Sequence, residues 1–472
     1  MSDKNTNVEI ISGDGINEFT QDKKHSGFTS KLGFVLAAAG SAVGLGNLWR
    51  FPYLTAKYGG GIFILTYIVL AVLFGVIMLM LEIGIGRHTG KGVIGAFTKL
   101  NKKFKWFGFA CVIVPLIIVP YYCVIGGWVV KYAWSFIVGS EGLVGVEGTT
   151  ETEAFFGNFV TSTWSPLIFF LIFAVLTVIV VAFGVQKGIE KMSKILMPAL
   201  AIMAVFLMIY VICQPGALEG VKYALIPDFD KFGFGTVLGA LGQLFYSMSI
   251  GMCIMITYGS YMKKDAKITS SSMQIAIFDS MFAFVASLII IPAMFAFTDP
   301  NVSLQKPGTS LMFVQLTNVF NALPIGRVIG LVFFLLVFFA AITSSVSLVE
   351  SIVAVLCEDG RMKRLTACLI VFGAILVLGT LSSLGNGALS GVEIFGLSIL
   401  DAFDFLANNI LMPIVAIITC VIAGWFIDKT ILPKEIGIDK NKKLNTYFNV
   451  IIRYVAPICI LVILVTGLFI TL

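Results

Sequence analysis

Residues 40–53 read GSAVGLGNLWRFPY, and they interrupt an otherwise apolar stretch with glycines and small polar side chains. A glycine in a helix interior costs about 1 kcal/mol relative to alanine, so the three glycines within residues 40–46 predict a break in a helix. A second interruption, SMSIG at residues 247–251, lies inside a later apolar stretch. The alternative is that glycine and serine at both places only let neighbouring helices pack closely. That alternative accounts less well for the polar residues Asn47 and Arg50 beside the first interruption.

The composition indicates that lipid surrounds most of the chain. Of 472 residues, 58% are apolar and 12% are charged, whereas soluble proteins carry about 25% charged residues. A helix needs about 20 apolar residues to cross a membrane, and runs of this length exclude a β-barrel. We therefore predict an all-α integral membrane protein with eleven transmembrane helices. The expected spans are 33–53, 62–85, 107–138, 165–183, 195–213, 235–259, 271–297, 324–356, 365–384, 394–424 and 447–471.

The distribution of charge predicts the orientation of the chain. Most of the 32 lysines and arginines fall in alternate loops, while residues 139–164 contain glutamates and no basic residue. The positive-inside rule then places the N-terminus in the cytoplasm and the C-terminus on the extracellular or periplasmic side of the cell (inner) membrane. A basic charge distributed in this way indicates topology and a lipid bilayer as partner, not nucleic acid. The polar residues 1–25 lack the pattern of a cleavable signal peptide.

The two interrupted spans are five helices apart, as expected if helices 1–5 and 6–10 are inverted repeats that each open with a broken helix. Secondary transporters bind substrate and ions where such broken helices face each other, because the ends of half-helices supply free backbone donors and acceptors. The expected organisation follows from this spacing. It comprises a cytoplasmic tail (1–25), a first repeat (26–213), a second repeat (214–426), and a cytoplasmic loop with helix 11 (427–472).

Four motifs along the chain resemble one family, the neurotransmitter:sodium symporters, and especially its bacterial eleven-helix amino-acid transporters. The stretch 40–53 resembles the first-helix signature of this family, and GQLFYSMSIGM at 242–252 is similar to its sixth helix. AAITSS at 340–345 resembles the eighth helix and DAFDF at 401–405 the tenth. The resemblance implies a sodium-coupled symporter that imports a small amino acid by alternating access. The broken-helix geometry is that of the family and is not worked out from these residues.

The resemblance also implies two sodium sites built from oxygen ligands, which a hard cation prefers. The substrate carboxylate completes the first of these sites. The hydroxyls assigned to the second site have an alternative role, a hydrogen bond back to their own helix. Sodium site 1 comprises Ala42, Asn47, Ser247 and Asp279, and sodium site 2 comprises Gly40, Val43, Ala340, Thr343 and Ser344.

Asp279 departs from the pattern of the family, because many relatives carry asparagine at this position. An ionised carboxylate within the membrane is costly and is retained mainly with a countercharge. We expect Asp279 to supply the negative charge that chloride supplies in some relatives, so no chloride requirement is expected. Two alternatives remain open: a protonated Asp279 held by hydrogen bonds, and a proton-coupled amino-acid carrier of the same fold.

The resemblance places the substrate between the broken helices and helices 3 and 8. Amine transporters of the family have an aspartate where this chain has Gly44, so the resemblance favours amino acids over amines. The wall formed by Ile118, Tyr246, Met252 and Leu348 favours a hydrophobic or aromatic L-amino acid. The implied substrate-binding residues are Ser41, Ala42, Gly44, Gly46, Ile118, Tyr122, Tyr246, Ser247, Ser249, Met252, Ser344 and Leu348.

The implied gates lie on both sides of this pocket. Arg50 and Asp404 are expected to pair across the outer mouth. The inner side lacks the arginine–tryptophan motif of the family, and its implied gate residues are Lys24, His25, Tyr261 and Glu358. No residue is assigned a catalytic role, since an enzyme would need a nucleophile with a base, or a metal cluster. A channel would need a symmetric filter, and a transport-like amino-acid sensor remains an alternative. Nothing in the sequence indicates an oligomeric state.

Overall fold

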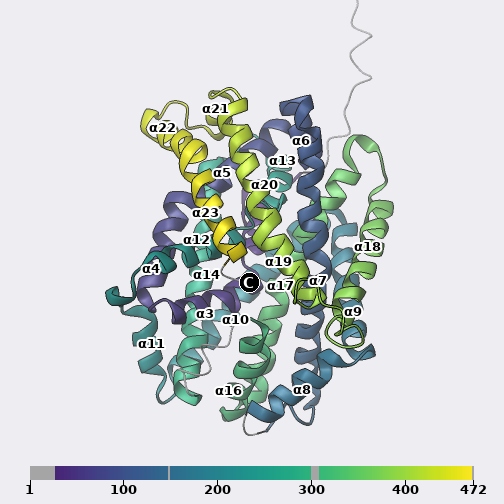
Figure 1. Ribbon diagram of the computed structural model, residues 1–472, viewed down its shortest axis with the longest axis vertical. Helices are drawn as coiled ribbons and strands as arrows, with labels where there is room; N and C mark the ends of the chain where they lie inside the picture. The colour runs from purple at the N-terminus through teal and green to yellow at the C-terminus, as the bar shows by residue number, and fades with distance from the viewer. Residues whose placement is uncertain (1–26, 147–148, 299–307, 470–472) are drawn as a thin grey trace, which may run out of the picture.

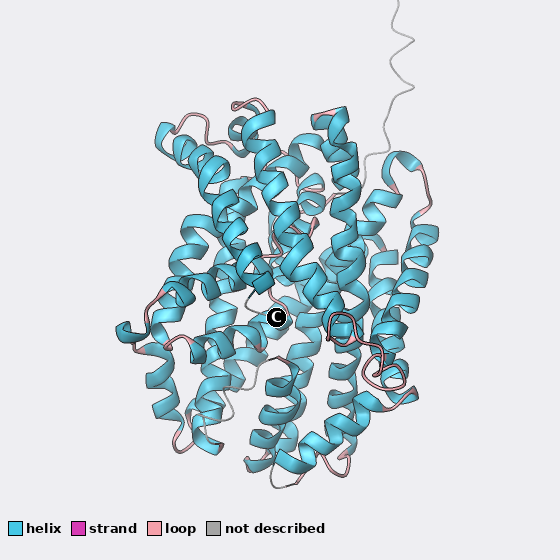
Figure 2. Cartoon of the chain, in the orientation of Figure 1, coloured by secondary structure: helices cyan, strands magenta, loops and turns pink. Residues whose placement is uncertain are grey.

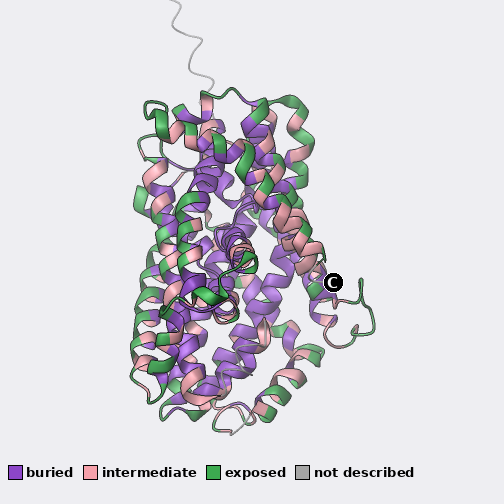
Figure 3. Cartoon of the chain, turned by 60° about the vertical axis from the view of Figure 1, so that its left-hand side comes forward, coloured by how far each residue is buried: buried purple, intermediate pink, exposed green. Residues whose placement is uncertain are grey.

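The computed structural model describes residues 27–146, 149–298 and 308–469. Within these ranges the chain is helical and contains no β-strand (Figure 2). Nine helices of the described chain are long and apolar enough to cross a membrane, or ten if a bent pair counts as one span. Figure 3 shows that buried residues fill the middle of the helical bundle. The expectation of an all-helical integral membrane protein is confirmed.

The long helices run along the long axis of the molecule (Figure 1). Several of them contain a π-helical turn. In the first half of the chain the spans are α4 (Gly61–Leu70), η1 (Ala71–Gly75) and α5 (Val76–Thr89); η2 (Lys102–Phe104) and α7 (Lys105–Val138); α9 (Trp164–Ala182); and η3 (Val185–Glu190) with α10 (Lys191–Ile212). In the second half they are α14 (Ile268–Phe297); α17 (Gly326–Leu356); α18 (Arg364–Leu384); α19 (Ile399–Phe405), η7 (Leu406–Leu411), α20 (Met412–Val421) and η8 (Ile422–Phe426); and α22 (Lys442–Val450), η9 (Ile451–Val455) and α23 (Ala456–Phe469).

The first apolar stretch forms a bent pair of helices. α1 (Lys31–Ala42) ends at the GSAVGLGN motif, and α2 (Leu45–Leu48) with α3 (Arg50–Lys57) continues after a bend of 61°. Gly44 between them has an extended backbone, with φ −124° and ψ −165°. The carbonyls at the end of α1 and the amides at the start of α2 therefore lack the partners that a continuous helix would provide.

The second predicted interruption separates α12 (Phe234–Ser247) from α13 (Ile254–Ser260). Three residues between them, Ser249, Gly251 and Cys253, have positive φ angles of 55°, 79° and 67°. This region of the Ramachandran plot is uncommon for residues other than glycine. The amide of Gly251 donates a hydrogen bond of 2.8 Å to Glu82 Oε1 in α5, so a buried carboxylate holds the interrupted backbone.

Glycines allow the half-helix α13 to pack directly against α5, with the backbone of one helix in contact with the backbone of the other. A Cβ atom on Gly86 would lie 1.9 Å from the carbonyl oxygen of Ile256, and a Cβ atom on Gly259 would lie 2.5 Å from that of Ile83. Each helix therefore needs glycine where it meets the other, and the two backbones touch without intervening side chains.

The remaining helices lie between or beyond the spans. One of them, α21, is held by ion pairs of Glu435. Its Oε1 lies 2.6 Å from Nε of Arg87 at the end of α5 and 3.0 Å from Nζ of Lys264, which lies between α13 and α14. Although burial raises the pKa of Glu435, the hydrogen bonds and charges of Lys264 and Arg87 hold it below its ordinary value. These helices are α6 (Val93–Leu100), α8 (Thr149–Thr161), α11 (Ala217–Leu225), η4 (Phe229–Lys231), η5 (Leu311–Gln315), α16 (Leu316–Ala322), η6 (Glu358–Gly360) and α21 (Ile431–Ile436).

The contact between α5 and α13 leads to a first prediction. Gly86→Ala inserts a methyl group against a backbone oxygen, so it should destabilise the fold by about 1–3 kcal/mol or more and lower the melting temperature of the protein in detergent. The matched control is Gly373→Ala in α18, where a Cβ would meet no atom within 4 Å. This control should melt at the same temperature as the unaltered protein, or slightly higher. Equal melting of all three proteins would show that the close contact does not constrain residue 86.

Candidate functional site

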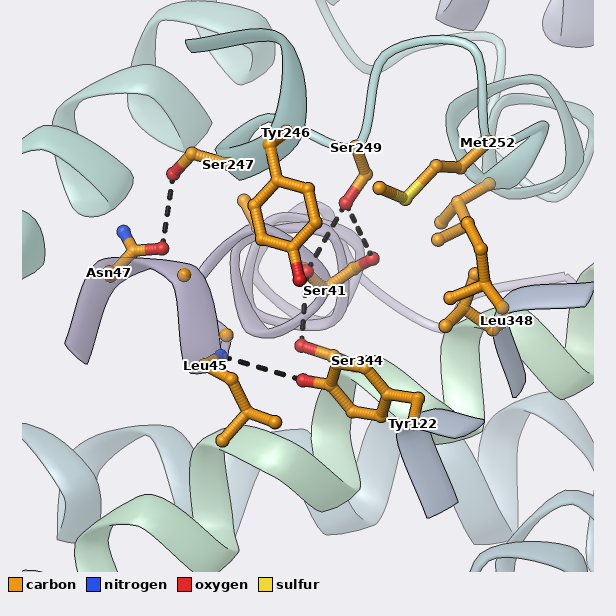
Figure 4. A pocket seen from close by; sticks show the side chains of 15 residues that line it. Ser41, Leu45, Asn47, Tyr122, Tyr246, Ser247, Ser249, Met252, Ser344 and Leu348 are labelled. Carbon is orange, nitrogen blue, oxygen red and sulfur yellow. Dashed lines mark hydrogen bonds between the residues drawn. The ribbon is translucent and has the colours of Figure 1, made fainter. Parts of the chain in front are cut away.

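A narrow cavity lies where the two helix breaks face each other, between α7 and α17. All twelve residues predicted to bind substrate line this one cavity. Figure 4 shows several of their side chains converging on it, from α1, α7, α12 and α17 among other segments. Three further lining residues, Leu45, Asn47 and Ile254, were not included in the prediction. Sequence proximity to the two motifs is the signal that would have found them.

The polar side of the cavity consists of backbone groups and hydroxyls. Ser249 and Ser344 each donate a hydrogen bond to the carbonyl of Ser41, at 3.3 and 3.2 Å (Figure 4). The hydroxyl of Tyr122 accepts a long hydrogen bond of 3.5 Å from the amide of Leu45. The end of α1 thus presents carbonyl oxygens, and the start of α2 presents amides, to the same space. The C-terminal end of a helix, where carbonyls are free, carries partial negative charge, and the N-terminal end, where amides are free, carries partial positive charge.

The opposite side of the cavity is apolar, and none of its lining residues is charged. Met252 and Leu348 lie together on this side (Figure 4). Two glycines keep the cavity narrow. A Cβ atom on Gly46 would lie 2.4 Å from Tyr246 Cε1, and a Cβ atom on Gly44 would lie 2.9 Å from the hydroxyl of Ser344. A side chain as large as aspartate at residue 44 would therefore fill the space between α1 and α17.

Three of the four residues predicted for sodium site 1, Asn47, Ser247 and Asp279, meet beside the cavity. Asp279 in α14 is fully buried and accepts hydrogen bonds from Asn47 Nδ2 at 2.8 Å and from Ser247 Oγ. Ser247 Oγ also lies 3.1 Å from Asn47 Oδ1. A residue that the sequence analysis did not include, Tyr67 in α4, donates to the second carboxylate oxygen of Asp279 at 2.5 Å. Amide, hydroxyl and carboxylate oxygens around one point are ligands that fit a hard cation.

Four of the five residues predicted for sodium site 2, all except Val43, also lie together between α1 and α17. Ser344 Oγ lies 3.3 Å from the carbonyl oxygen of Gly40 and 3.1 Å from that of Ala340. Thr343 Oγ1 bonds to carbonyls of its own helix, Phe339 and Ala340, each at 3.0 Å. The structure therefore brings hydroxyls and carbonyls of two helices together, while Thr343 makes the local hydrogen bond that was considered as its alternative role.

At the expected outer gate, Arg50 and Asp404 do not form a direct ion pair. The guanidinium of Arg50 instead lies over the ring of Tyr246, 5.5 Å from its centroid. Asp404 accepts a hydrogen bond of 2.7 Å from Asn408 Nδ2, which also reaches the hydroxyl of Tyr121 at 3.2 Å. Each side chain has another partner in this structure, and the pairing of Arg50 with Asp404 across the outer mouth stays a prediction.

At the other end of the cavity, the partner of Tyr261 is Glu350 and not Glu358. The Tyr261 hydroxyl donates to Glu350 Oε1 at 2.8 Å, and Arg364 in α18 binds both carboxylate oxygens of Glu350. Phe28 packs against Tyr261 with ring centroids 6.3 Å apart. Two other residues assigned to the inner gate, Lys24 and His25, lie outside the described residues. Glu350 could have been found in the sequence, since a lone carboxylate within an apolar span indicates a functional site.

Glu358 lies away from this network. It is buried beyond the end of α17, and a Cβ atom on Gly95 of α6 would lie 1.7 Å from its Oε1. Burial raises the pKa of Glu358, while the charge of Lys91 opposes the shift. Glu358 is thus held against the first turn of α6, and its assignment to the inner gate stays a prediction.

Two interrupted helices that enclose an uncharged cavity beside clusters of oxygen ligands define a secondary transporter. The model of the Sodium:neurotransmitter symporter family matches residues 25–140 and 158–471, and the chain belongs to this family. It is accordingly a sodium-dependent transporter, a multi-pass integral membrane protein that moves a small substrate. The family is one of transporters and not of enzymes.

Individual relatives match nearly the whole chain. The uncharacterized sodium-dependent transporter YhdH of Bacillus subtilis (strain 168) is 34% identical over 453 residues, which cover 94% of this chain and 97% of that protein. An uncharacterized sodium-dependent transporter of Haemophilus influenzae is 32% identical over 466 residues, 95% of this chain and 100% of that protein. The crystal structure of MhsT in complex with L-phenylalanine superposes with a TM-score of 0.84 at 35% identity, covering 94% of this chain and 100% of MhsT.

The cluster around Asp279 leads to a second prediction. Asp279→Asn removes the charged oxygen ligand, so the sodium concentration that gives half-maximal thermal stabilisation should rise about tenfold or more, which corresponds to ~1.4 kcal/mol. Ser280→Ala is the matched control, because Ser280 lines the outer face of α14. The control should titrate like the unaltered protein. An unchanged sodium titration of Asp279→Asn would mean that Asp279 is a structural residue and not an ion ligand.

Proposed function

We propose that the chain is a sodium-coupled symporter that imports a hydrophobic or aromatic L-amino acid by alternating access. The observation that carries this proposal is the sharing of residues between the cavity and the first oxygen cluster. Asn47 and Ser247 line the cavity and also contact Asp279. A sodium ion held by this cluster would therefore lie beside the substrate, and binding of one would favour binding of the other.

The cavity suits a zwitterion because it supplies partial charges and no full charge. The substrate carboxylate would face the sodium ion, the amide of Leu45 and the hydroxyl of Tyr122. The substrate ammonium would face carbonyl oxygens at the end of α1, including that of Ser41, where the helix carries partial negative charge. Gly44 leaves no carboxylate to bind an amine that lacks its own acid group. This arrangement supports amino acids over amines as substrates.

The side chain of the substrate would lie against the apolar wall formed by Ile118, Tyr246, Met252 and Leu348. Methionine adapts its shape and makes favourable contacts with aromatic rings. MhsT, whose structure superposes on this chain, was crystallised with L-phenylalanine. Both observations support a hydrophobic or aromatic amino acid as the substrate.

The proposed topology has eleven transmembrane helices in two inverted repeats of five, followed by helix 11. The bent pair α1–α3 would open the first repeat, and α12 with α13 would form the first helix of the second. The basic end of the molecule, which holds α6, α21 and the start of α22, would face the cytoplasm. This places the N-terminus inside and the C-terminus outside a cell membrane. Two sodium ions would bind, one at each oxygen cluster.

The contacts at the two ends of the cavity support a description of the conformational state. Phe28, Tyr261 and Glu350 join α13 to α17 at the basic end. At the other end, Arg50 and Asp404 remain separate. We assign the structure to a state closed toward the cytoplasm. Transport would then require the contact between Tyr261 and Glu350 to open while the outer residues close.

The test of the proposed function is uptake of a radiolabelled aromatic amino acid into proteoliposomes. Replacing external sodium by potassium at a fixed pH gradient should abolish uptake. Uptake that follows the proton gradient and ignores sodium would establish the proton-coupled alternative. Binding without any uptake would establish a sensor. In the same assay, leucine, tryptophan and tyrosine should compete with the labelled substrate, and dopamine-like amines should not. Inhibition by amines alone would overturn the assignment of the cavity.

A further prediction concerns chloride. Two unit charges about 4 Å apart interact by roughly 4 kcal/mol at an effective dielectric constant near 20, so the Asp279 carboxylate is sufficient to balance a sodium ion. Replacing chloride by gluconate should therefore leave uptake unchanged. Asp279→Asn combined with Ala283→Ser should restore activity in a chloride-dependent form, because hydroxyl and amide donors can hold the anion. Loss of most uptake by the unaltered protein in gluconate would contradict the proposed role of Asp279.

A further inference from the structure

An apolar groove runs along the outside of the bundle between η1 and α14. Its rims are exposed: Val72 is 46%, Ile277 54% and Met281 50% accessible, although all three are large and apolar. These residues lie within membrane-spanning helices, so lipid and not water surrounds them. A groove of this kind takes an acyl chain.

A second, basic hollow lies at the start of α22. It is lined by Lys442, Lys443 and Tyr447, among others. Tyr447 joins the two features, because its hydroxyl donates a hydrogen bond of 2.7 Å to the carbonyl of Leu73 in η1. Leu73 is adjacent in sequence to Val72, which lines the groove. The basic hollow and the apolar groove therefore lie on either side of one π-helical turn.

The two lysines form no ion pair within the described part of the chain, and both are exposed. They begin the membrane span Lys442–Phe469, which places them at the level of the lipid headgroups. Figure 1 shows α22 at the same end of the molecule as α21 and α6, the end that the proposed topology assigns to the cytoplasm. Adjacent lysines at this depth attract anionic headgroups.

We propose that the hollow and the groove together form one binding site for an anionic diacyl phospholipid. Its phosphate would lie between Lys442 and Lys443, and one acyl chain would follow the groove past Ile277. Because two cations are present and no carboxylate lines the hollow, the site favours a headgroup with net negative charge over a zwitterionic one. The occupant would also cover the outer faces of the two helices that bear Tyr67 and Asp279 on their inner faces.

The test measures lipid bound to the full-length protein and does not depend on transport. Protein is reconstituted with equal amounts of phosphatidylglycerol and phosphatidylcholine, purified in detergent, and analysed for retained lipid by mass spectrometry. The unaltered protein should retain phosphatidylglycerol preferentially. Lys442→Gln with Lys443→Gln should lower this preference about thirtyfold, or ~2 kcal/mol for two basic residues near a membrane surface.

The matched control is Lys102→Gln with Lys103→Gln, another exposed pair of lysines at the same end of the molecule. This control should keep the preference of the unaltered protein. Ile277→Trp, which fills the groove, should reduce retention of both lipids. Equal loss in the two lysine pairs would show general surface attraction and overturn the site. Displacement of the lipid by glycerol phosphate as readily as by phosphatidylglycerol would overturn the role of the groove.

Discussion

Backbone amides and carbonyls in the interior of a membrane cost several kcal/mol when they lack a hydrogen-bond partner. This chain contains two such interior stretches, at 43–44 and 248–253, where helices stop and restart. The rest of the site follows from how the fold satisfies them. The breaks lie opposite each other, Glu82 binds the amide of Gly251, and Ser249 binds the carbonyl of Ser41. The backbone amides and carbonyls that keep no partner within the protein surround the cavity. The helix breaks therefore supply the polar groups of the site.

Four buried carboxylates lie within the spans of the described residues, and three of them, Asp279, Glu350 and Glu82, are stabilised in different ways. Asp279 accepts hydrogen bonds from an amide and two hydroxyls, and it faces the first oxygen cluster. Glu350 is bound by Arg364 and by Tyr261. Glu82 binds the backbone through one oxygen, while its second oxygen has no hydrogen-bond partner. The negative charge of a carboxylate bound by neutral donors is left for a cation to balance, whereas arginine already balances the charge of Glu350. This difference favours Asp279 over Glu350 as an ion ligand.

Much of the fold and of the cavity lining is predictable from the sequence, because both depend on local patterns. Apolar length identifies the spans, and glycine and serine identify the breaks that bring residues 40–47 and 247–251 together. Pairing between side chains is less predictable. No local pattern in the sequence indicates that Arg50 lies over Tyr246 or that Asp404 accepts a hydrogen bond from Asn408. Tyr67 and Arg364 were missed because an aromatic residue in an apolar helix and a basic residue at a helix start have no distinctive local pattern.

The glycine contact between α5 and α13 has a mechanical consequence. A layer of side chains lets two helices slide by changing rotamers, but backbone against backbone at Gly86 and Gly259 leaves no rotamers to change. The half-helix α13 and the half of α5 that it contacts are therefore expected to move together as one rigid unit. Any displacement of α13 that separates Tyr261 from Glu350 must carry α5 with it, and with α5 the short helix α21, which Glu435 binds to Arg87. Opening of the contact between Tyr261 and Glu350 would therefore move a large part of the basic end of the molecule, and not α13 alone.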